Sequence, residues 1–328
     1  MSEAFYGALA QDIKRWGQEL GFDDIGICDT DLSQYTPHFL DWLDKGYNAG
    51  MAWMGEHGNM RYTPDALVPG TVRVISARMN YLPLDSAHIK TLKTPEKAYI
   101  ARYALGRDYH KLMRKRLARL ADKIRSALID ANLPEPEQRA FVDSAPVLER
   151  PLAEKAGLGW VGKHTLVINK EAGSWFFLGE IYTSAPLPVT QPAPVENHCG
   201  ECTACLKVCP TDAFPTPYTL DANRCISYLT IENKGSIPEE FREPIGNRVF
   251  GCDDCQAICP WNKYAHTSSE PDFSPRHQLD DCDLLTLFQW DEATFLKHTE
   301  GSAIRRIGYE GWQRNLAVGL GNVPSDPE

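Results

Sequence analysis

Cysteines are the residues of this chain whose spacing points most directly to chemistry. Cys199, Cys202, Cys205 and Cys209 follow the spacing C-x2-C-x2-C-x3-C, and Pro210 comes directly after them. This is the spacing of bacterial [4Fe–4S] proteins, in which the fourth cysteine binds the other of two clusters. Thiolates are soft ligands that suit iron–sulfur centres, and two-residue gaps let one tight loop wrap three corners of a cube. The fourth ligand of that cube must then come from elsewhere in the chain.

Half of the pattern returns further along, as Cys252, Cys255 and Cys259 before a second proline. One cysteine of the usual run is missing there, and Cys225 lies upstream to replace it. We therefore predict two crossed ligand sets. The first cluster is bound by Cys199, Cys202, Cys205 and Cys259, and the second by Cys209, Cys225, Cys252 and Cys255.

Structural zinc is the alternative for the same eight cysteines, because each zinc ion needs four ligands. The C-x3-C-P ending of both motifs is typical of ferredoxins and is not needed by a zinc ribbon, so the spacing favours iron–sulfur. Of the ten cysteines, Cys28 and Cys282 stay outside both sets. Two neighbouring clusters form a path for electrons, but they do not show what is reduced.

The composition predicts a folded, acidic chain with no membrane span. With 328 residues, 43% of them hydrophobic, the chain is long enough for more than one domain. No run approaches about 18 apolar residues, and the N-terminus predicts an amphipathic helix instead of a secretory signal. We therefore expect a cytoplasmic protein, where clustered thiols bind metals more often than they form disulfides. The net charge of −10 argues against a general nucleic-acid binder.

The order of predicted elements divides the chain into three parts. Strands and helices are mixed up to residue 190, with a strand over 71–82 and a long basic helix ending near Leu133. This pattern predicts an α+β or α/β domain over residues 1–190. A proline-rich stretch leads into a ferredoxin-like domain for two [4Fe–4S] clusters over residues 191–265. Residues 266–328 form a short C-terminal helical segment.

A glycine-rich segment and one aspartate are weaker signals. Gly157, Gly159 and Gly162 form G-x-G-x-x-G, but a helical segment precedes them, whereas a dinucleotide site needs a strand there. Asp143 follows an apolar strand in "RAFVDSAP", where an acid can face a pocket. An Asx turn or a helix N-cap explains Asp143 equally well.

The blocks "FVDSAPVLERPLAEKAGLGWVGKHTLVIN" and "FFLGEI", followed by the two cysteine motifs, resemble the epoxyqueuosine reductase family. The resemblance covers residues 5 to 320. It implies an oxidoreductase that carries cobalamin and two [4Fe–4S] clusters, with an architecture similar to that of the reductive dehalogenases. It also implies that the substrate is tRNA carrying epoxyqueuosine at the wobble position, whose epoxide is reduced to the alkene. The electron donor is unidentified, and we expect a monomer.

The resemblance further implies roles for single residues. Asp143 is expected to protonate the epoxide oxygen, and burial beside the corrin is expected to favour its protonated form. Cobalamin is expected to be base-off, without a protein histidine on cobalt. Asp108 and His110 agree with this, because Met113 replaces the glycine of the D-x-H-x-x-G motif with which some corrinoid proteins supply that histidine. The other expected cobalamin contacts are Arg61, Tyr103, Lys163, His164 and Ser227, between the first domain and the cluster domain.

Substrate contacts and two alternative functions stay open at this stage. The basic helix, with Lys297, Arg305 and Arg306, either contacts tRNA phosphates or is an ordinary solvated surface. Family members often continue into a HEAT-like helical unit, and "GWQRNLAVGLGN" resembles the opening of that unit. The alternatives are a corrinoid reductive dehalogenase-like enzyme acting on a small molecule and a non-catalytic iron–sulfur electron-transfer subunit. The long region before the clusters argues against the second, because a ferredoxin does not need it.

Overall fold

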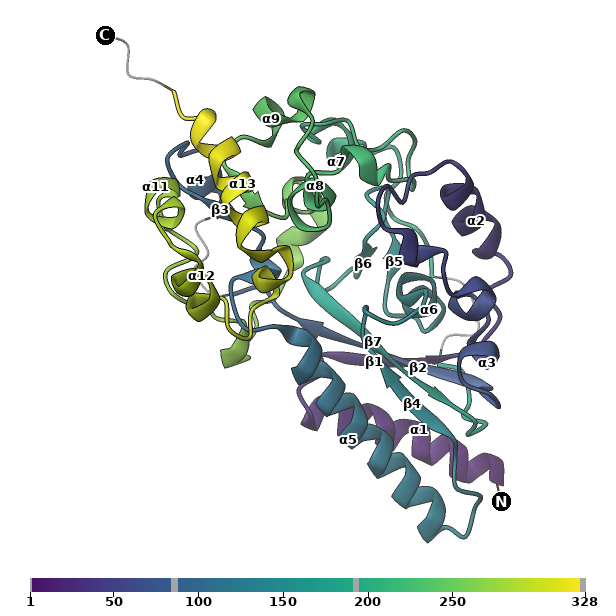
Figure 1. The fold of residues 1–328 in the computed structure, drawn as a ribbon. Helices are drawn as coiled ribbons and strands as arrows, with labels where there is room; N and C mark the ends of the chain where they lie inside the picture. Colours follow the sequence, from purple (N-terminus) through teal and green to yellow (C-terminus); the bar gives the residue numbers. More distant parts are fainter. Residues whose placement is uncertain (1, 84–87, 191–194, 325–328) are drawn as a thin grey trace.

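A four-stranded sheet is the centre of the first part of the chain. The computed structural model describes residues 2–83, 88–190 and 195–324. The strands, in spatial order, are β1 (Asp24–Cys28), β2 (Arg73–Asn80), β7 (Phe176–Thr183) and β4 (Gln138–Phe141) (Figure 1). All three pairings are antiparallel. The sheet therefore selects the α+β form of the predicted fold class, and β2 confirms the strand predicted over 71–82.

Helices cover both faces of this sheet. Helices α1 (Ser2–Glu19) and α5 (Tyr109–Asp130) pack together on one face, and α6 (Glu149–Lys155) packs on the other (Figure 1). The buried side chains of α5, among them Met113, Leu117 and Leu120, recur every three or four residues and form the stripe that faces the sheet. The helix ends three residues before the predicted Leu133, with Asn132 in the left-handed region at φ 56°.

Shorter elements complete the chain. The first part also contains α2 (Thr36–Asp44), α3 (Pro64–Leu67), α4 (His88–Leu92), β3 (Tyr99–Ile100) and the hairpin of β5 (Trp160–Val161) and β6 (Val167–Ile168). The cysteine-rich region contains α7 (Ala204–Lys207), α8 (Ile226–Ile231), α9 (Glu239–Ile245), β8 (Arg248–Phe250) and α10 (Asp254–Ala257). The last part contains α11 (Leu284–Phe288), α12 (Glu292–His298) and α13 (Gly308–Gly321). The 3-10 helices are η1 (Ala52–Met54), η2 (Gly58–Arg61), η3 (Arg102–Ala104), η4 (Ala222–Arg224), η5 (Pro260–Tyr264), η6 (Pro271–Phe273) and η7 (Ala303–Ile307).

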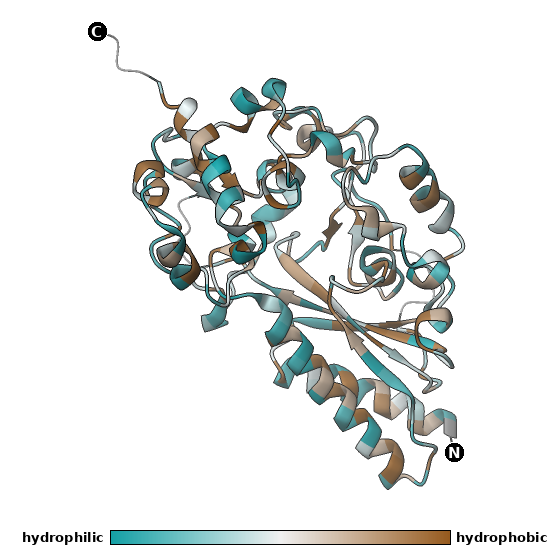
Figure 2. Cartoon of the chain, in the orientation of Figure 1, coloured by the Kyte–Doolittle hydropathy of each residue, from teal (hydrophilic) through white to brown (hydrophobic). Residues whose placement is uncertain are grey.

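A second hydrophobic core joins regions that are distant in sequence. Strand β3 pairs in parallel with β8, so a segment of the first part lies beside the cysteine-rich region. Ile100 and Leu105 share this core with Phe250, Leu284 and Trp312. Figure 2 shows hydrophobic residues along the strands and a mixture of hydrophobic and hydrophilic residues on the helices around them. The division at residues 190 and 265 stays a prediction, and residue 191 lies outside the described residues.

Gly26 on β1 lets helix α6 approach the sheet closely, and alanine at this position is expected to destabilise the fold. A Cβ atom there would lie 1.9 Å from the backbone oxygen of Ala156, which directly follows α6. Neither backbone can yield cheaply, so the free energy of unfolding is expected to fall by about 1–3 kcal/mol in urea titration. Gly7→Ala in α1 is the matched control, since a Cβ there meets nothing within 4 Å and alanine favours a helix. Equal stability of Gly26→Ala and wild type would contradict this close approach.

Among the described residues, no helix has both the length and the apolar character that crossing a bilayer requires.

Candidate active site

The cysteines predicted for the first cluster lie near one another. Burial raises the pKa of the Cys205 thiol to about 11, and the charges of Cys259, Cys199 and Cys202 act in the same direction. Cys202 is exposed, whereas Cys205 and Cys259 are buried. The predicted set thus reaches the protein surface on one side.

The cysteines predicted for the second cluster lie deeper. Burial raises the pKa of Cys255 well above its ordinary value, with further contributions from Cys225 and Cys209. Arg248 fixes the loop of Cys252 through two hydrogen bonds of 2.7 Å from its guanidinium to the carboxylate of Asp254. A two-pronged pair of this kind is geometrically specific. The loop is therefore held from strand β8, inside the second core.

The cysteines do not form single-ion sites. Within the described ranges, no three His, Cys, Asp or Glu side chains are arranged to hold one metal ion. A tetrahedral zinc site would need four sulfurs, each about 2.3 Å from the metal. The preference for iron–sulfur over zinc therefore rests on the cysteine spacing.

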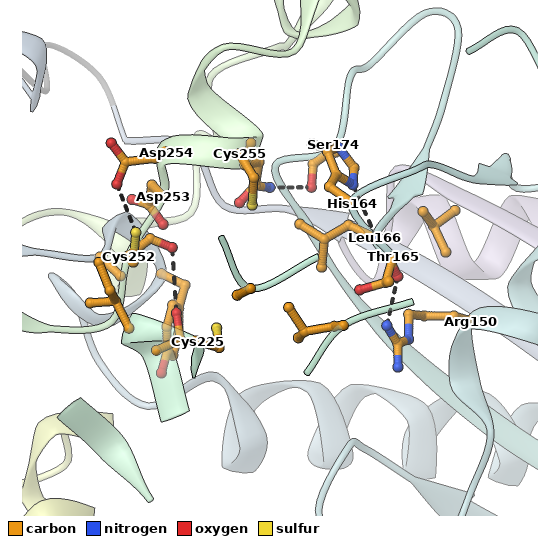
Figure 3. A pocket seen from close by; sticks show the side chains of 18 of the residues that line it. Arg150, His164, Thr165, Leu166, Ser174, Cys225, Cys252, Asp253, Asp254 and Cys255 are labelled. Carbon is orange, nitrogen blue, oxygen red and sulfur yellow. Dashed lines mark hydrogen bonds between the residues drawn. The ribbon is translucent and has the colours of Figure 1, made fainter. Parts of the chain in front are cut away.

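A cavity of about 500 Å³ lies between the inner cysteines and the sheet. Its wall includes all four cysteines predicted for the second cluster, namely Cys209, Cys225, Cys252 and Cys255. Asp143, Tyr103, Tyr109, His164 and Ser227 also line it. Figure 3 shows labelled cysteines on one side of a pocket and Thr165 and Arg150 on the other. We call this space the main cavity.

A second cavity, also of about 500 Å³, adjoins the main cavity. Both spaces are lined by Asp143, Glu149, Arg150, Thr165 and Leu220, so these residues form a common wall. The rest of the second cavity is rich in aromatic side chains, among them Phe39, Trp42 and Trp53, and it includes Arg61. Two apolar spaces with a few polar groups on a shared wall suit a large ligand with distinct parts.

Asp143 reaches both cavities. Its side chain is 40% exposed, because the loop after β4 turns it toward the two cavities. The hydroxyl of Tyr109 donates to Oδ2 of Asp143, and Nε2 of His110 donates to Oδ1. Asp108 caps helix α5 and thereby places both neighbours, since its carboxylate accepts from the His110 backbone at 3.0 Å.

Two further carboxyl groups lie behind Asp143. Glu180 on β7 is fully buried, and Phe141, two residues before Asp143, is its partner in the sheet. Burial raises the pKa of Glu180 to about 8, and the charge of Asp143 adds to this although the Ser76 hydroxyl opposes it. Glu149 begins α6, and burial, Glu180 and Asp143 together raise its pKa well above the ordinary value. Both groups therefore favour the neutral acid form at pH 7.

Glu180 is expected to make the protein less stable as the pH rises. An acid whose pKa is higher in the folded than in the unfolded state stabilises the fold most at a pH below its unfolded pKa, near 4.5. This stabilisation is lost as the pH rises toward the folded pKa of about 8. The melting temperature should fall over that range, and Glu180→Gln should reduce the slope. Glu154→Gln is the control, because that carboxyl already accepts from Tyr35 and Val161. An unchanged slope in Glu180→Gln would exclude this role.

The other predicted cobalamin contacts fall in three places. Tyr103, His164 and Ser227 line the main cavity, and Arg61 lines the second. Lys163 lines neither cavity, because its ammonium group donates to the carbonyl oxygens of Gly200 and Cys202 at 2.6 and 2.9 Å. The structure thus places Lys163 on the loop of the first cysteine set.

His164 has a ring nitrogen available to a ligand. Its Nδ1 accepts from the Leu166 backbone at 3.2 Å, and its Nε2 is buried with no partner among the described residues. Burial lowers its pKa to about 4, so the ring is neutral and Nε2 carries the hydrogen. A buried donor of this kind is costly unless something accepts from it.

The glycine-rich segment has a packing role. Gly159 and Gly162 flank the first strand of the hairpin β5–β6, and a Cβ on Gly159 would lie 2.2 Å from the oxygen of Ile168. These glycines serve a tight hairpin that follows helix α6.

Comparison with known proteins places this architecture in a family. Residues 61–144 match the family model described as epoxyqueuosine reductase QueG, DUF1730, and residues 198–262 match the 4Fe-4S double cluster binding domain. The epoxyqueuosine reductase of Salmonella typhimurium is 61% identical over 96% of this chain and 80% of its own length. The enzyme of Pseudomonas aeruginosa is 59% identical over 97% of this chain and 86% of its own length.

Solved structures agree with these relatives. An epoxyqueuosine reductase crystal structure has a TM-score of 0.86 at 29% identity, covering 96% of this chain and 82% of the other. A second one, solved with an epoxyqueuosine-modified tRNA-Tyr stem loop, has a TM-score of 0.85 over 96% of this chain and 81% of the other. The Bacillus subtilis enzyme, solved with an aspartate-bearing catalytic loop swung out of the active site, has a TM-score of 0.84. This chain is a member of the epoxyqueuosine reductase family of oxidoreductases and contains a double-cluster 4Fe–4S domain.

Proposed function

We propose that this chain reduces epoxyqueuosine in tRNA to queuosine, with electrons passing through two [4Fe–4S] clusters to a bound cobalamin and with Asp143 as the proton donor. One observation carries the proposal: the four cysteines predicted for the second cluster and Asp143 line the same cavity. A cluster held by those thiols would border the space in which an acid also lies. The proposed substrate is inferred from the relatives, which are named epoxyqueuosine reductases, one of them solved with an epoxyqueuosine-modified tRNA stem loop.

The residues around both cavities fit a corrinoid. Such a ligand has a broad apolar ring edged with amide groups and a nucleotide tail, and His164 Nε2 and Glu149 Oε1 are shielded polar atoms without partners among the described residues. Tyr103, His164 and Ser227 would contact it in the main cavity and Arg61 in the second. When bound, cobalamin supplies a low-valent metal centre that can deliver two electrons to the epoxide.

Asp143 is the acid in this proposal. Opening of the epoxide leaves negative charge on oxygen, and a carboxylic acid beside it lowers the cost of that charge by donating a proton. The Bacillus subtilis relative has a catalytic loop that carries an aspartate, and Asp143 likewise lies in a loop, after β4. Tyr109 and His110 orient its two oxygens by hydrogen bonds.

The beginning of α5 is the proposed phosphate-binding surface. Lys111, Arg114 and Lys115 are exposed there, and Arg114 donates to the Ser144 hydroxyl, next to Asp143, at 3.3 Å. Further along the helix, Arg116 and Lys123 pair with Glu270 and Glu19 of other elements. Exposed cations next to the acid are where an incoming RNA backbone is best neutralised.

The test is anaerobic turnover of an epoxyqueuosine-modified RNA stem loop by the reconstituted protein, compared with a halogenated aromatic compound. The proposal predicts loss of the epoxide oxygen from the RNA and no dehalogenation. Dehalogenation without RNA reduction would instead support the small-molecule alternative. A protein that assembles its clusters and reduces neither compound would contradict both enzymatic hypotheses.

A further inference from the structure

Epoxide reduction requires more protons than Asp143 can carry at once. Converting the three-membered ring to an alkene and water breaks two C–O bonds, forms one C=C bond, and consumes two electrons and two protons. A carboxyl group delivers one proton at a time. A second proton must therefore reach the reacting oxygen within each turnover, if the proposed function is correct.

His110 links Asp143 to a second carboxylate. Its Nε2 donates to Oδ1 of Asp143, and its Nδ1 donates to Oδ1 of Asp108 at 2.5 Å. When Asp143 is ionised, both partners are carboxylates, which only accept, so both ring nitrogens carry hydrogen and the ring is an imidazolium. The Tyr109 ring stacks on His110 with centroids 4.2 Å apart and on Phe177 with centroids 3.7 Å apart, which holds it in place.

These three groups form a path from solvent to the cavity. The side chain of Asp108 is 33% exposed, that of His110 is 20% exposed, and Asp143 lines both cavities. A proton taken up beside Asp108 can therefore pass through the imidazole ring to Asp143 without crossing the apolar wall.

The charges around His110 favour its protonated state. Burial lowers its pKa, but the hydrogen bonds and negative charges of Asp108 and Asp143 outweigh burial and raise the pKa to about 9. Several ionisable groups face His110. They are Asp108, which caps α5, Tyr109 and Lys111 in α5, Asp143 after β4, and Glu149 and Glu180 behind Asp143. At pH 7 the ring thus holds a proton, which the alkoxide oxygen of the opened epoxide, a far stronger base than imidazole, can draw through Asp143.

We propose that His110 recharges Asp143 between the two proton transfers of one turnover. Asp143 first gives its carboxyl proton to the epoxide oxygen as one C–O bond breaks. The Nε2–H bond of His110 then breaks, and the Asp143 O–H bond forms again. The second transfer lets the oxygen leave as water, and both electrons would be provided by a bound cobalamin supplied by the clusters. Neutral His110 regains its proton from solvent beside Asp108, so His110 acts through Asp143 and does not touch the substrate.

Histidine titration by NMR tests the proton-holding state without any turnover. In protein with oxidised clusters and ¹⁵N-labelled histidine, we expect one ring to titrate near pH 9 and to be lost in His110→Gln. In Asp143→Asn the same ring should titrate at lower pH. His277→Gln, at an exposed histidine outside both cavities, should leave this resonance unchanged. If every histidine of the wild type titrates in the ordinary range, the proposal fails.

Kinetics test the transfer itself. His110→Gln should lower kcat on the RNA stem loop by about 10²-fold with little change in KM, and should enlarge the solvent deuterium isotope effect. Added imidazole should partly restore the rate of His110→Ala, which a purely structural role would not explain. Wild-type kcat and isotope effect in His110→Gln would overturn the proposal. If wild type and His277→Gln are both inactive, the proposed function fails, while the NMR result still decides the state of His110.

Discussion

Asp143→Asn is expected to lower kcat for epoxyqueuosine reduction by about 10²–10⁴-fold, the usual contribution of a positioned acid. Asparagine keeps the size of the side chain but only one acceptor oxygen, so only one of the two hydrogen bonds, from Tyr109 or from His110, can persist unchanged. It cannot donate a carboxyl proton to the alkoxide. KM for the RNA and the absorption of the clusters should stay close to those of the wild type. Anaerobic single-turnover kinetics with prereduced protein would measure the effect.

Asp65→Asn is the matched control for that experiment. Asp65 is exposed, accepts from the Gly70 backbone at 2.7 Å, and lines neither cavity, so the same substitution there should leave kcat unchanged. A wild-type rate in Asp143→Asn would remove the acid role from this residue. Equal losses in both variants would point to a general effect of the substitution.

Cys255→Ala is expected to abolish turnover and to reduce bound iron from about eight to about four per chain. Three thiolates cannot hold all four irons of a cube, and the second set lies directly at the main cavity. Electrons would then stop at the first cluster, none of whose predicted ligands lines the main cavity. Colorimetric iron and sulfide determination on anaerobically purified protein would measure the loss.

Cys282→Ser tests whether the effect is specific to the ligand set. Cys282 is a half-buried free thiol beside the second core and lies outside both motifs. This variant should keep about eight irons per chain and full activity. Retention of eight irons by Cys255→Ala, or a loss of iron in Cys282→Ser, would contradict the crossed ligand assignment.

The sequence predicted the family and the fold class, and it grouped the cysteines into two ligand sets because the signals for these sets are local; the ligand sets themselves stay a prediction. A C-x2-C spacing determines which loop can surround a cluster, whatever the rest of the chain does. The crossed assignment of Cys209 to the second set rests on the same rule, and the structure places Cys209 at the main cavity with Cys225, Cys252 and Cys255.

Features that depend on distant contacts were not predictable in this way. The 40% exposure of the Asp143 side chain follows from where the loop after β4 meets two cavities, and its burial beside a corrin stays a prediction. Asp108 and His110 entered the sequence predictions only in relation to a corrinoid motif, and the structure shows that Asp108 caps helix α5. Nothing in the sequence indicated that the His110 ring would reach Asp143, because this contact depends on α5 packing under β4 and β7.

Glu149, Glu180 and Lys163 show the same limit. Glu180 lies in an apolar strand, and the pattern of that strand predicts only that its side chain is buried. The pairing of Glu180 with Phe141 in the sheet is what brings it near the loop of Asp143. Glu149 meets Glu180 because α6 packs on β7. Lys163 lies in the turn between β5 and β6, and its ammonium group donates hydrogen bonds to the loop of the first cysteine set. The sequence alone does not show that this loop lies beside Lys163.

Elemental analysis of the protein after anaerobic reconstitution with iron, sulfide and cobalamin, followed by gel filtration, tests the central claim most directly. That claim is that cluster thiols and Asp143 enclose a corrinoid. The account predicts about eight irons and about one cobalt per chain. Iron without retained cobalt, or zinc in place of iron, would contradict it.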